Sequence, residues 1–266
     1  MKLPGTFQPK QKSDDKLEEL LDSDPFYPGA LAIAVSFTYQ EAWATDIMVW
    51  TPEMDEPEKV ARRFGYVQGL CVYENLLYDA GENRKVIDTL NRKVVARREN
   101  QISSLCVHKG VMYDGGLKEI FKTDEGKLVA KREGWVKALR SCNGELYDAG
   151  SYRRVVRTFD NYTIAERKDW IYALGSQDNK LYDATEKGIS NTFKKKTVTR
   201  RRGIPFTLFS FNNKLYDGGQ YPYIYETSPS FFKKRFLRTD LRERYNGVTA
   251  VQPISFWLAN QLLRKA

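Results

Sequence analysis

The sequence is poor in the residues that build disulfide frameworks and metal centres. It has three cysteines, Cys71, Cys106 and Cys142, and a single histidine, His108. The cysteines form no Cys-x-x-Cys pair, which argues against a disulfide framework or a zinc knuckle. We therefore expect them to be small buried apolar groups. One histidine excludes a cage of several histidine ligands, and we expect neither a metal nor another cofactor.

Long apolar runs are also missing. No stretch approaches the ~20 apolar residues of a membrane-spanning helix, and the N-terminal segment lacks an apolar core like that of a secretory signal. A Ser-His-Asp triad would need His108, which lies in the turn-like stretch VHKGVMYD. We expect a cytoplasmic protein without such a triad, and the sequence favours a non-enzymatic role.

Acidic residues are fewer than basic ones. The chain has 34 Asp and Glu against 43 Lys and Arg, which gives a net charge of +9 and an isoelectric point near 9.3. Such a balance favours acidic partners, namely nucleic acid, an acidic protein or an anionic membrane surface. An ordinary charge-rich surface is the simpler interpretation unless the basic residues cluster.

The sequence does contain a regular repeat. Tyr-Asp occurs five times, and its tyrosines are separated by 35, 34, 35 and 34 residues. An apolar residue followed three positions later by threonine recurs in six copies, whose threonines are separated by 38, 34, 35, 34 and 35 residues. The tyrosines are Tyr78, Tyr113, Tyr147, Tyr182 and Tyr216, and the threonines are Thr51, Thr89, Thr123, Thr158, Thr192 and Thr227.

A period near 34 also fits arrays of helical hairpins, so the local composition has to decide. Each unit has clusters of Gly, Asn or Asp every eight to ten residues, which would interrupt helices. Short runs rich in Val, Ile, Tyr, Phe and Thr lie between these clusters. One unit divides into WVKALRSC, ELYDAG, VVRTF and YTIAERK, which predicts four strands joined by hairpin turns.

Units of four short antiparallel strands resemble the blades of β-propeller repeat proteins, and the resemblance covers residues 29–247. The paired motifs of WD repeats and of kelch repeats are missing, so the resemblance is to propellers in general. The six threonines predict an all-β fold, a six-bladed propeller of four-stranded blades. In the first unit, AWATD at residues 42–46 is expected in place of LLYDAG, and the sixth unit carries an insertion. Residues 248–256 predict one further strand, which would pair with the first blade.

Two short helices are expected outside the ring. One follows Ser13, a plausible N-cap, over residues 14–21. The other ends the chain and has apolar residues on one side, with basic residues in its last turn. The expected organisation is an extension over residues 1–28, a propeller over 29–256 and a helix over 257–266. We expect the C-terminal helix to pack on the propeller, with partner docking as the alternative.

An arginine precedes each repeated aspartate by sixteen residues. The arginine belongs to the last strand of one unit and the aspartate to the second strand of the next, so the two can bridge neighbouring blades. Guanidinium and carboxylate match in a two-pronged hydrogen bond. We interpret these pairs as structural, with a ring of carboxylates for a cation or of arginines for an anion as the alternative. The expected pairs are Arg63–Asp79, Arg98–Asp114, Arg132–Asp148, Arg167–Asp183 and Arg201–Asp217.

A ligand of a propeller is expected where the first strands begin, at one mouth of the central channel. The candidate rim residues vary between units, as a site for an asymmetric ligand should, although we favour simple packing of the strand starts against neighbouring blades. The candidates are Tyr66, Gln101, Trp135, Asp169 and Trp170.

Basic residues concentrate in the expected fourth strands. Lysine and arginine at such an outer edge prevent strands of other molecules from pairing with it. The densest cluster, interleaved with phenylalanines, is also a candidate for binding phosphate backbones and stacking bases. It comprises Lys194, Lys195, Lys196, Arg200, Arg201 and Arg202, continued by Lys233, Lys234 and Arg235.

Three functions fit these features. The first is a non-catalytic scaffold that binds a protein partner. The second is a nucleic-acid-binding module that uses the basic cluster. The third is a sugar-binding or hydrolytic propeller with acids at the channel mouth, for which Glu133 and Asp169 are the nearest candidates by position.

Overall fold

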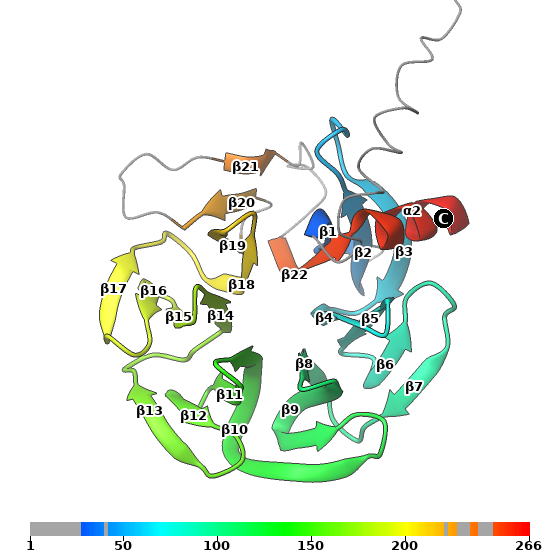
Figure 1. The fold of residues 1–266 in the computed structure, drawn as a ribbon. Helices are drawn as coiled ribbons and strands as arrows, with labels where there is room; N and C mark the ends of the chain where they lie inside the picture. The colour runs from blue at the N-terminus through cyan, green and yellow to red at the C-terminus, as the bar shows by residue number, and fades with distance from the viewer. Residues whose placement is uncertain (1–27, 40–41, 221–222, 228–234, 239–246) are drawn as a thin grey trace, which may run out of the picture.

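The computed structural model describes residues 28–39, 42–220, 223–227, 235–238 and 247–266. Its antiparallel sheets are arranged around a central axis, as Figure 1 shows, so the chain is an all-β propeller with one C-terminal helix. The helix expected over residues 14–21 lies outside the described residues. Among the described residues, no helix is long and apolar enough to cross a membrane.

The strands of the described residues form five sheets, so the prediction of six separate four-stranded blades is wrong. Four sheets have four strands and one has six, because β9 and β10 are long and run through what the sequence suggested were separate strands. The first sheet has the order β22(Gly247–Ser255), β1(Pro28–Tyr39), β2(Ala42–Trp50) and β3(Glu58–Phe64). The second has β4(Val67–Tyr73), β5(Leu76–Gly81), β6(Lys85–Asp88) and β7(Val94–Arg97).

The six-stranded sheet contains β8(Ile102–His108), β9(Val111–Lys122), β10(Lys127–Cys142), β11(Glu145–Gly150), β12(Arg154–Arg157) and β13(Tyr162–Glu166). The next sheet contains β14(Ala173–Gln177), β15(Lys180–Thr185), β16(Gly188–Asn191) and β17(Lys196–Thr199). The last contains β18(Pro205–Phe211), β19(Lys214–Gly219), β20(Tyr223–Glu226) and β21(Arg235–Arg238). The strands nearest the axis contact one another in the cyclic order β22, β4, β8, β10, β14 and β18.

The ring closes through the two ends of the described chain. Strand β22 pairs with β1 and takes the innermost place of the first sheet, which confirms the predicted pairing of the last strand. The assignment of AWATD was wrong, because residues 42–46 lie in β2, the third strand of that sheet, and β1 is the second. Ala44 therefore does not stand at the position of the repeated aspartate. The sequence misled here because the innermost strand comes from the other end of the chain.

The hairpin turns follow from their residues. In the turn between β10 and β11, Asn143 and Gly144 both have positive φ, 50° and 72°. Two-residue turns of this kind match the twist of paired strands, and Asn-Gly tolerates them best. The glycine that ends LYDAG has a different cause, since a Cβ on Gly150 would lie 1.7 Å from the carbonyl oxygen of Trp135. That glycine lets the first and second strands approach closely at one end of the sheet.

The repeated tyrosines are packing residues, as expected. Tyr78, Tyr113, Tyr147 and Tyr216 are buried. The ring of Tyr147 meets the ring of Phe193, from the neighbouring sheet, edge to face at 6.1 Å. The three cysteines are buried and unpaired, which confirms their predicted role as small core groups.

The C-terminal helix α2(Phe256–Lys265) packs on the first sheet, as predicted. It begins at Ser255, whose hydroxyl accepts a hydrogen bond from the Leu258 N–H at 3.2 Å. Leu258, Ala259 and Leu262 are buried in the core that β1, β2 and β22 share. The helix therefore covers the sheet in which the ring closes.

Shortening Leu262 to alanine should lower the free energy of unfolding by about 2–5 kcal/mol, because it leaves a cavity between helix and sheet. Denaturant titration followed by circular dichroism measures this change. Arg264→Ala, on the exposed side of the same helix, should change stability by no more than about 1 kcal/mol. Equal effects of the two substitutions would contradict the packing of α2 described above.

Candidate functional site

The repeated arginines and aspartates meet as five two-pronged ion pairs. Each arginine donates from Nε and from a terminal nitrogen to the two carboxylate oxygens of the aspartate sixteen residues later, at 2.5–2.9 Å. Arg63, for example, lies in β3 and Asp79 in β5 of the next sheet. Arg132 and Asp148 join β10 to β11 within the six-stranded sheet.

These pairs are almost closed to solvent. The aspartate side chains are at most 4% exposed and the arginine side chains 6–15%. In four of the five, the repeated threonine that directly follows the third strand also donates to the carboxylate, at 2.7–2.9 Å. Burial raises the pKa of the Asp79 carboxyl, while its hydrogen bonds from Arg63 and Thr89 counteract that rise. The aspartates thus have their partners inside the fold, and a ring of free carboxylates does not exist here.

The first sheet has an ion pair of another kind. Asp46 in β2 accepts two hydrogen bonds from Arg62 in the adjacent strand β3, at 2.6 and 2.9 Å. This pair lies within one sheet and does not bridge two sheets. The repeat signal missed it because the arginine follows the aspartate instead of preceding it.

A cavity of about 430 Å³ opens at the mouth of the channel where the first strands begin. Of the candidate rim residues, Tyr66 and Trp170 line it, whereas Gln101, Trp135 and Asp169 do not. The Trp135 ring is nevertheless close, since the ammonium of Lys137 lies 4.5 Å from its centroid. We call this cavity the aromatic mouth; its lining residues are Ser36, Trp43, Tyr66, Gln68, Ser103, Lys137, Trp170, Tyr172, Phe206, Gln220, Gly247 and Thr249.

The sequence pattern located the right end of the strands but chose a position two residues too early. The lining includes one residue from each of β4, β8, β10 and β18, and Tyr172 just before β14. These five recur with the repeat, and alternate residues of a strand share a face. The signal that could have found them is their variation between polar, charged and aromatic types. They are Gln68, Ser103, Lys137, Tyr172 and Phe206.

The aromatic rings of the mouth touch one another at angles. The centroids of Trp43 and Tyr66 lie 4.5 Å apart, and those of Trp170 and Tyr172 lie 6.2 Å apart. Tyr172 meets Phe206 edge to face, also at 6.2 Å. The rings thus form a cup of tilted faces, and Trp43 and Trp170 remain about 40% exposed.

Both mouth tyrosines keep their phenolic proton over a wide pH range. Burial, reinforced by the charge of Glu82, raises the pKa of Tyr66 to about 12. Burial and a hydrogen bond raise the pKa of Tyr172 to about 12 as well, and its hydroxyl donates to Glu186 at 2.9 Å. The rim therefore adds no negative charge from its phenols at neutral pH.

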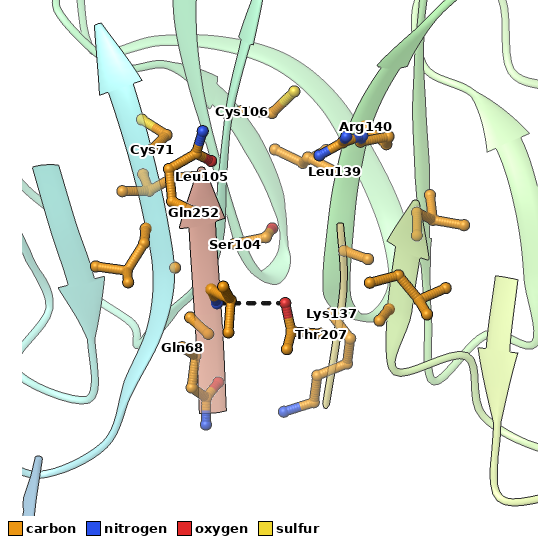
Figure 2. A pocket seen from close by; sticks show the side chains of 18 of the residues that line it. Gln68, Cys71, Ser104, Leu105, Cys106, Lys137, Leu139, Arg140, Thr207 and Gln252 are labelled. Atoms are coloured by element: carbon orange, nitrogen blue, oxygen red, sulfur yellow. Dashed lines mark hydrogen bonds between the residues drawn. The ribbon is translucent and has the colours of Figure 1, made fainter. Parts of the chain in front are cut away.

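Behind the mouth, the channel itself holds a second cavity of about 310 Å³. Five buried leucines, one from each inner strand except β22, contribute to its lining: Leu70, Leu105, Leu139, Leu174 and Leu208. Figure 2 shows Lys137 and Gln68 at one end of this cavity and Arg140 and Gln252 at the other. The backbone N–H of Val251 donates to the Thr207 hydroxyl at 3.3 Å across the lining.

The charged residues that line the two cavities are all basic among the described residues. Lys137 lines both and Arg140 lines the inner one, while no Asp or Glu lines either among the described residues. Burial lowers the pKa of the Lys137 ammonium and that of the Arg140 guanidinium. Arg140 donates from Nε to the Ser176 hydroxyl at 3.0 Å. These two cations therefore have no carboxylate beside them in the described lining of either cavity.

The residues of the predicted basic cluster do not all lie in the same environment. Lys194, Lys195, Lys196, Arg200 and Arg202 are exposed on or beside β17, the outermost strand of its sheet. Arg201 belongs to the ion pair with Asp217. Lys233 and Lys234 lie outside the described residues, and Arg235 begins β21. The candidate acids of the third hypothesis are engaged elsewhere, because Glu133 pairs with Arg154 at 3.0 Å and Asp169 with Lys187 at 2.9 Å.

Comparisons with solved structures agree with the propeller architecture. The WD40 β-propeller domain of Doa1 superposes with a TM-score of 0.50 at 11% identity, over 84% of this chain and 85% of that one. The extracellular domain of the putative one component system BT4673 from B. thetaiotaomicron gives a TM-score of 0.52 at 14% identity, over 71% of this chain and 32% of that one. The chain has a β-propeller fold. Its sequence matches no protein-family profile and no curated protein.

Asp148→Ala should lower the free energy of unfolding by about 3–5 kcal/mol, because it leaves the Arg132 guanidinium buried without its counter-ion. Chemical denaturation measures the loss. The matched control is Asp160→Ala, which removes an exposed pair with Arg157 and should lower stability far less, because solvent screens that pair. A loss of ligand affinity in Asp148→Ala at unchanged stability would instead assign the carboxylate to a binding site.

Proposed function

We propose that this propeller is a non-catalytic scaffold that binds a protein partner at its aromatic mouth. The observation that supports this most directly is the convergence of Trp43, Tyr66, Trp170, Tyr172 and Phe206 on one cavity. Partly exposed aromatic side chains in a cup supply large contact area at a low entropic cost, and they dominate the binding energy of many protein interfaces.

The chemistry of the mouth disfavours a hydrolytic site. A glycoside hydrolase needs two carboxyl groups flanking the substrate, and the described lining of the mouth has none. Glu133 and Asp169 hold arginine and lysine outside it. The mouth thus provides groups for binding and lacks an acid and base for this reaction.

Nucleic-acid binding is the second candidate, supported by the five exposed basic side chains on and beside β17. Electrostatic binding to phosphates is strongest at low salt. A single-stranded oligonucleotide should then bind at ~50 mM salt and be released as salt rises, and failure to bind at ~50 mM removes this candidate. In that case the cluster serves to protect the outer strand from pairing.

We also infer that the six-stranded sheet acts as two units of the ring, so that the scaffold offers six positions around the mouth. Both β8 and β10 contact inner strands on either side, and the pairing of β9 with β10 shifts register between Lys131 and Trp135. An experimental structure in which β8 to β13 form one flat sheet without a bend there would contradict this inference.

Trp170→Ala and Tyr66→Ala should each weaken capture of the native partner at least about tenfold, since aromatic anchors contribute most of such binding energy. Quantitative mass spectrometry of proteins retained from the source cells, compared between wild type and variants, measures the change. Tyr162→Ala is the control, because Tyr162 is 61% exposed on the outer strand β13 and does not line the mouth. Partners retained equally by all four proteins would place the interaction elsewhere.

A further inference from the structure

The chemistry of the aromatic mouth points to a more specific ligand than a protein surface in general. Lys137 is its one cationic lining residue among those described, and it projects from β10 toward the channel axis beside Gln68 (Figure 2). Its ammonium lies over the Trp135 ring, and no described carboxylate lines the cavity. A cation that is partly withdrawn from water without a counter-ion is unfavourable for the free protein.

The fold does not need a cation at this position. The equivalent residues of the other repeats are Gln68, Ser103, Tyr172 and Phe206, and their strands have the same place in the ring. The same holds for Arg140 deeper in the channel, whose equivalents are Cys71, Cys106, Gly175 and Phe209. Both cations are on β10 alone, so their presence has no explanation in the repeated architecture.

The two cations act together on anything that enters the mouth. Lys137 lies at the end of the inner cavity nearer the aromatic mouth, and Arg140 lies at its opposite end beside Leu139 (Figure 2). No described carboxylate lines the cavity between them, so no lining charge of opposite sign offsets their field. A negatively charged group is therefore favoured at the inner end of the mouth, with apolar groups against the tilted rings around it.

We propose that the aromatic mouth binds a peptide segment in which an acidic side chain, seated at Lys137, is flanked by a large apolar or aromatic residue. This rests on the proposed function and names the chemistry of the partner. A cavity of about 430 Å³ accommodates a few side chains of a peptide, within the range of ordinary ligand sites.

The same geometry disfavours two other anionic polymers. Single-stranded nucleic acid needs a row of cations along its backbone and flat faces on which successive bases stack. The described mouth offers one lysine, and its rings meet at 33° and 42° or edge to face. An acidic polysaccharide likewise presents repeated charges and many hydroxyl groups, whereas this lining combines one charge with an apolar cup.

The test is selection from a random heptapeptide phage library on immobilised wild-type protein and on Lys137→Gln. The wild type should enrich peptides with Asp or Glu next to Phe, Tyr, Trp or Leu, and Lys137→Gln should keep the apolar preference but lose the acidic one. Enrichment of uncharged apolar peptides by both proteins would overturn this inference and leave the proposed function standing. No enrichment by the wild type would overturn both.

Affinities of one selected peptide, measured by fluorescence polarisation, make the test quantitative. Lys137→Gln should weaken the acidic peptide at least tenfold, while its Asn or Gln analogue should bind both proteins equally, as a double-mutant cycle requires for a direct pair. Lys137→Arg should restore most of the affinity, and Lys180→Gln, outside the mouth, should change nothing. Tighter binding of oligothymidine or polygalacturonate than of the peptide, with the same dependence on Lys137, would overturn the assignment to a peptide.

Thermal unfolding separates binding from a structural role. Lys137→Met removes an uncompensated cation from the channel, so its Tm should equal or exceed that of the wild type. A clearly lower Tm would show that Lys137 supports the fold through Trp135 and would overturn its assignment to ligand binding.

Discussion

The buried contact between one arginine and one aspartate is the interaction on which the ring depends. A propeller has few covalent ties between its sheets, so neighbouring sheets must be held in register by side chains. Here a guanidinium from the last strand of one unit enters the next unit and satisfies a carboxylate that would otherwise be buried alone. The repeated threonine completes the carboxylate's hydrogen bonds. Because each pair is closed to solvent, losing either partner is far more costly than losing a surface ion pair.

The residues that hold the ring together are distinct from those that line the aromatic mouth. The residues that repeat most regularly, Tyr, Asp, Arg and Thr, are buried or bonded within the ring, and none of them lines the aromatic mouth. The mouth is lined instead by positions where the repeats differ, such as Gln68, Lys137 and Phe206. A ring of similar units can thus present an asymmetric surface, because equivalent positions of the five repeats contribute different side chains to the same opening.

The asymmetry is greatest at β10. This strand is the longest in the ring, joins two parts of the six-stranded sheet and contributes both channel cations. The neighbouring units have uncharged residues at the same positions. Charge in the channel therefore comes from one direction, which orients a ligand as well as attracting it.

The sequence alone determined the repeat, the strands and the pairing of each arginine with its aspartate. These features are local or recur at a fixed spacing. Asn-Gly turns, the alternation of residue types in the strands and the sixteen residues between each arginine and its aspartate can all be counted along the chain. The sequence also indicated that the last strand returns to the first sheet, because a ring must close. It gave Tyr66 and Trp170 as rim residues but missed Lys137, Tyr172 and Phe206, since the direction in which a strand residue points depends on its twist and register within the ring.

Only the tertiary structure decided the number of sheets, the place of AWATD and the lining of the channel. Strands β9 and β10 merge two units because their hydrogen bonds continue where composition suggested a break. AWATD lies in the third strand of the first sheet because β22, which comes from the C-terminal end of the chain, is the innermost strand of that sheet. Only the tertiary structure also shows that no described carboxylate lines the cavity beside Lys137. That depends on which side chains of the five other inner strands face the axis, and spacing along the sequence does not specify this.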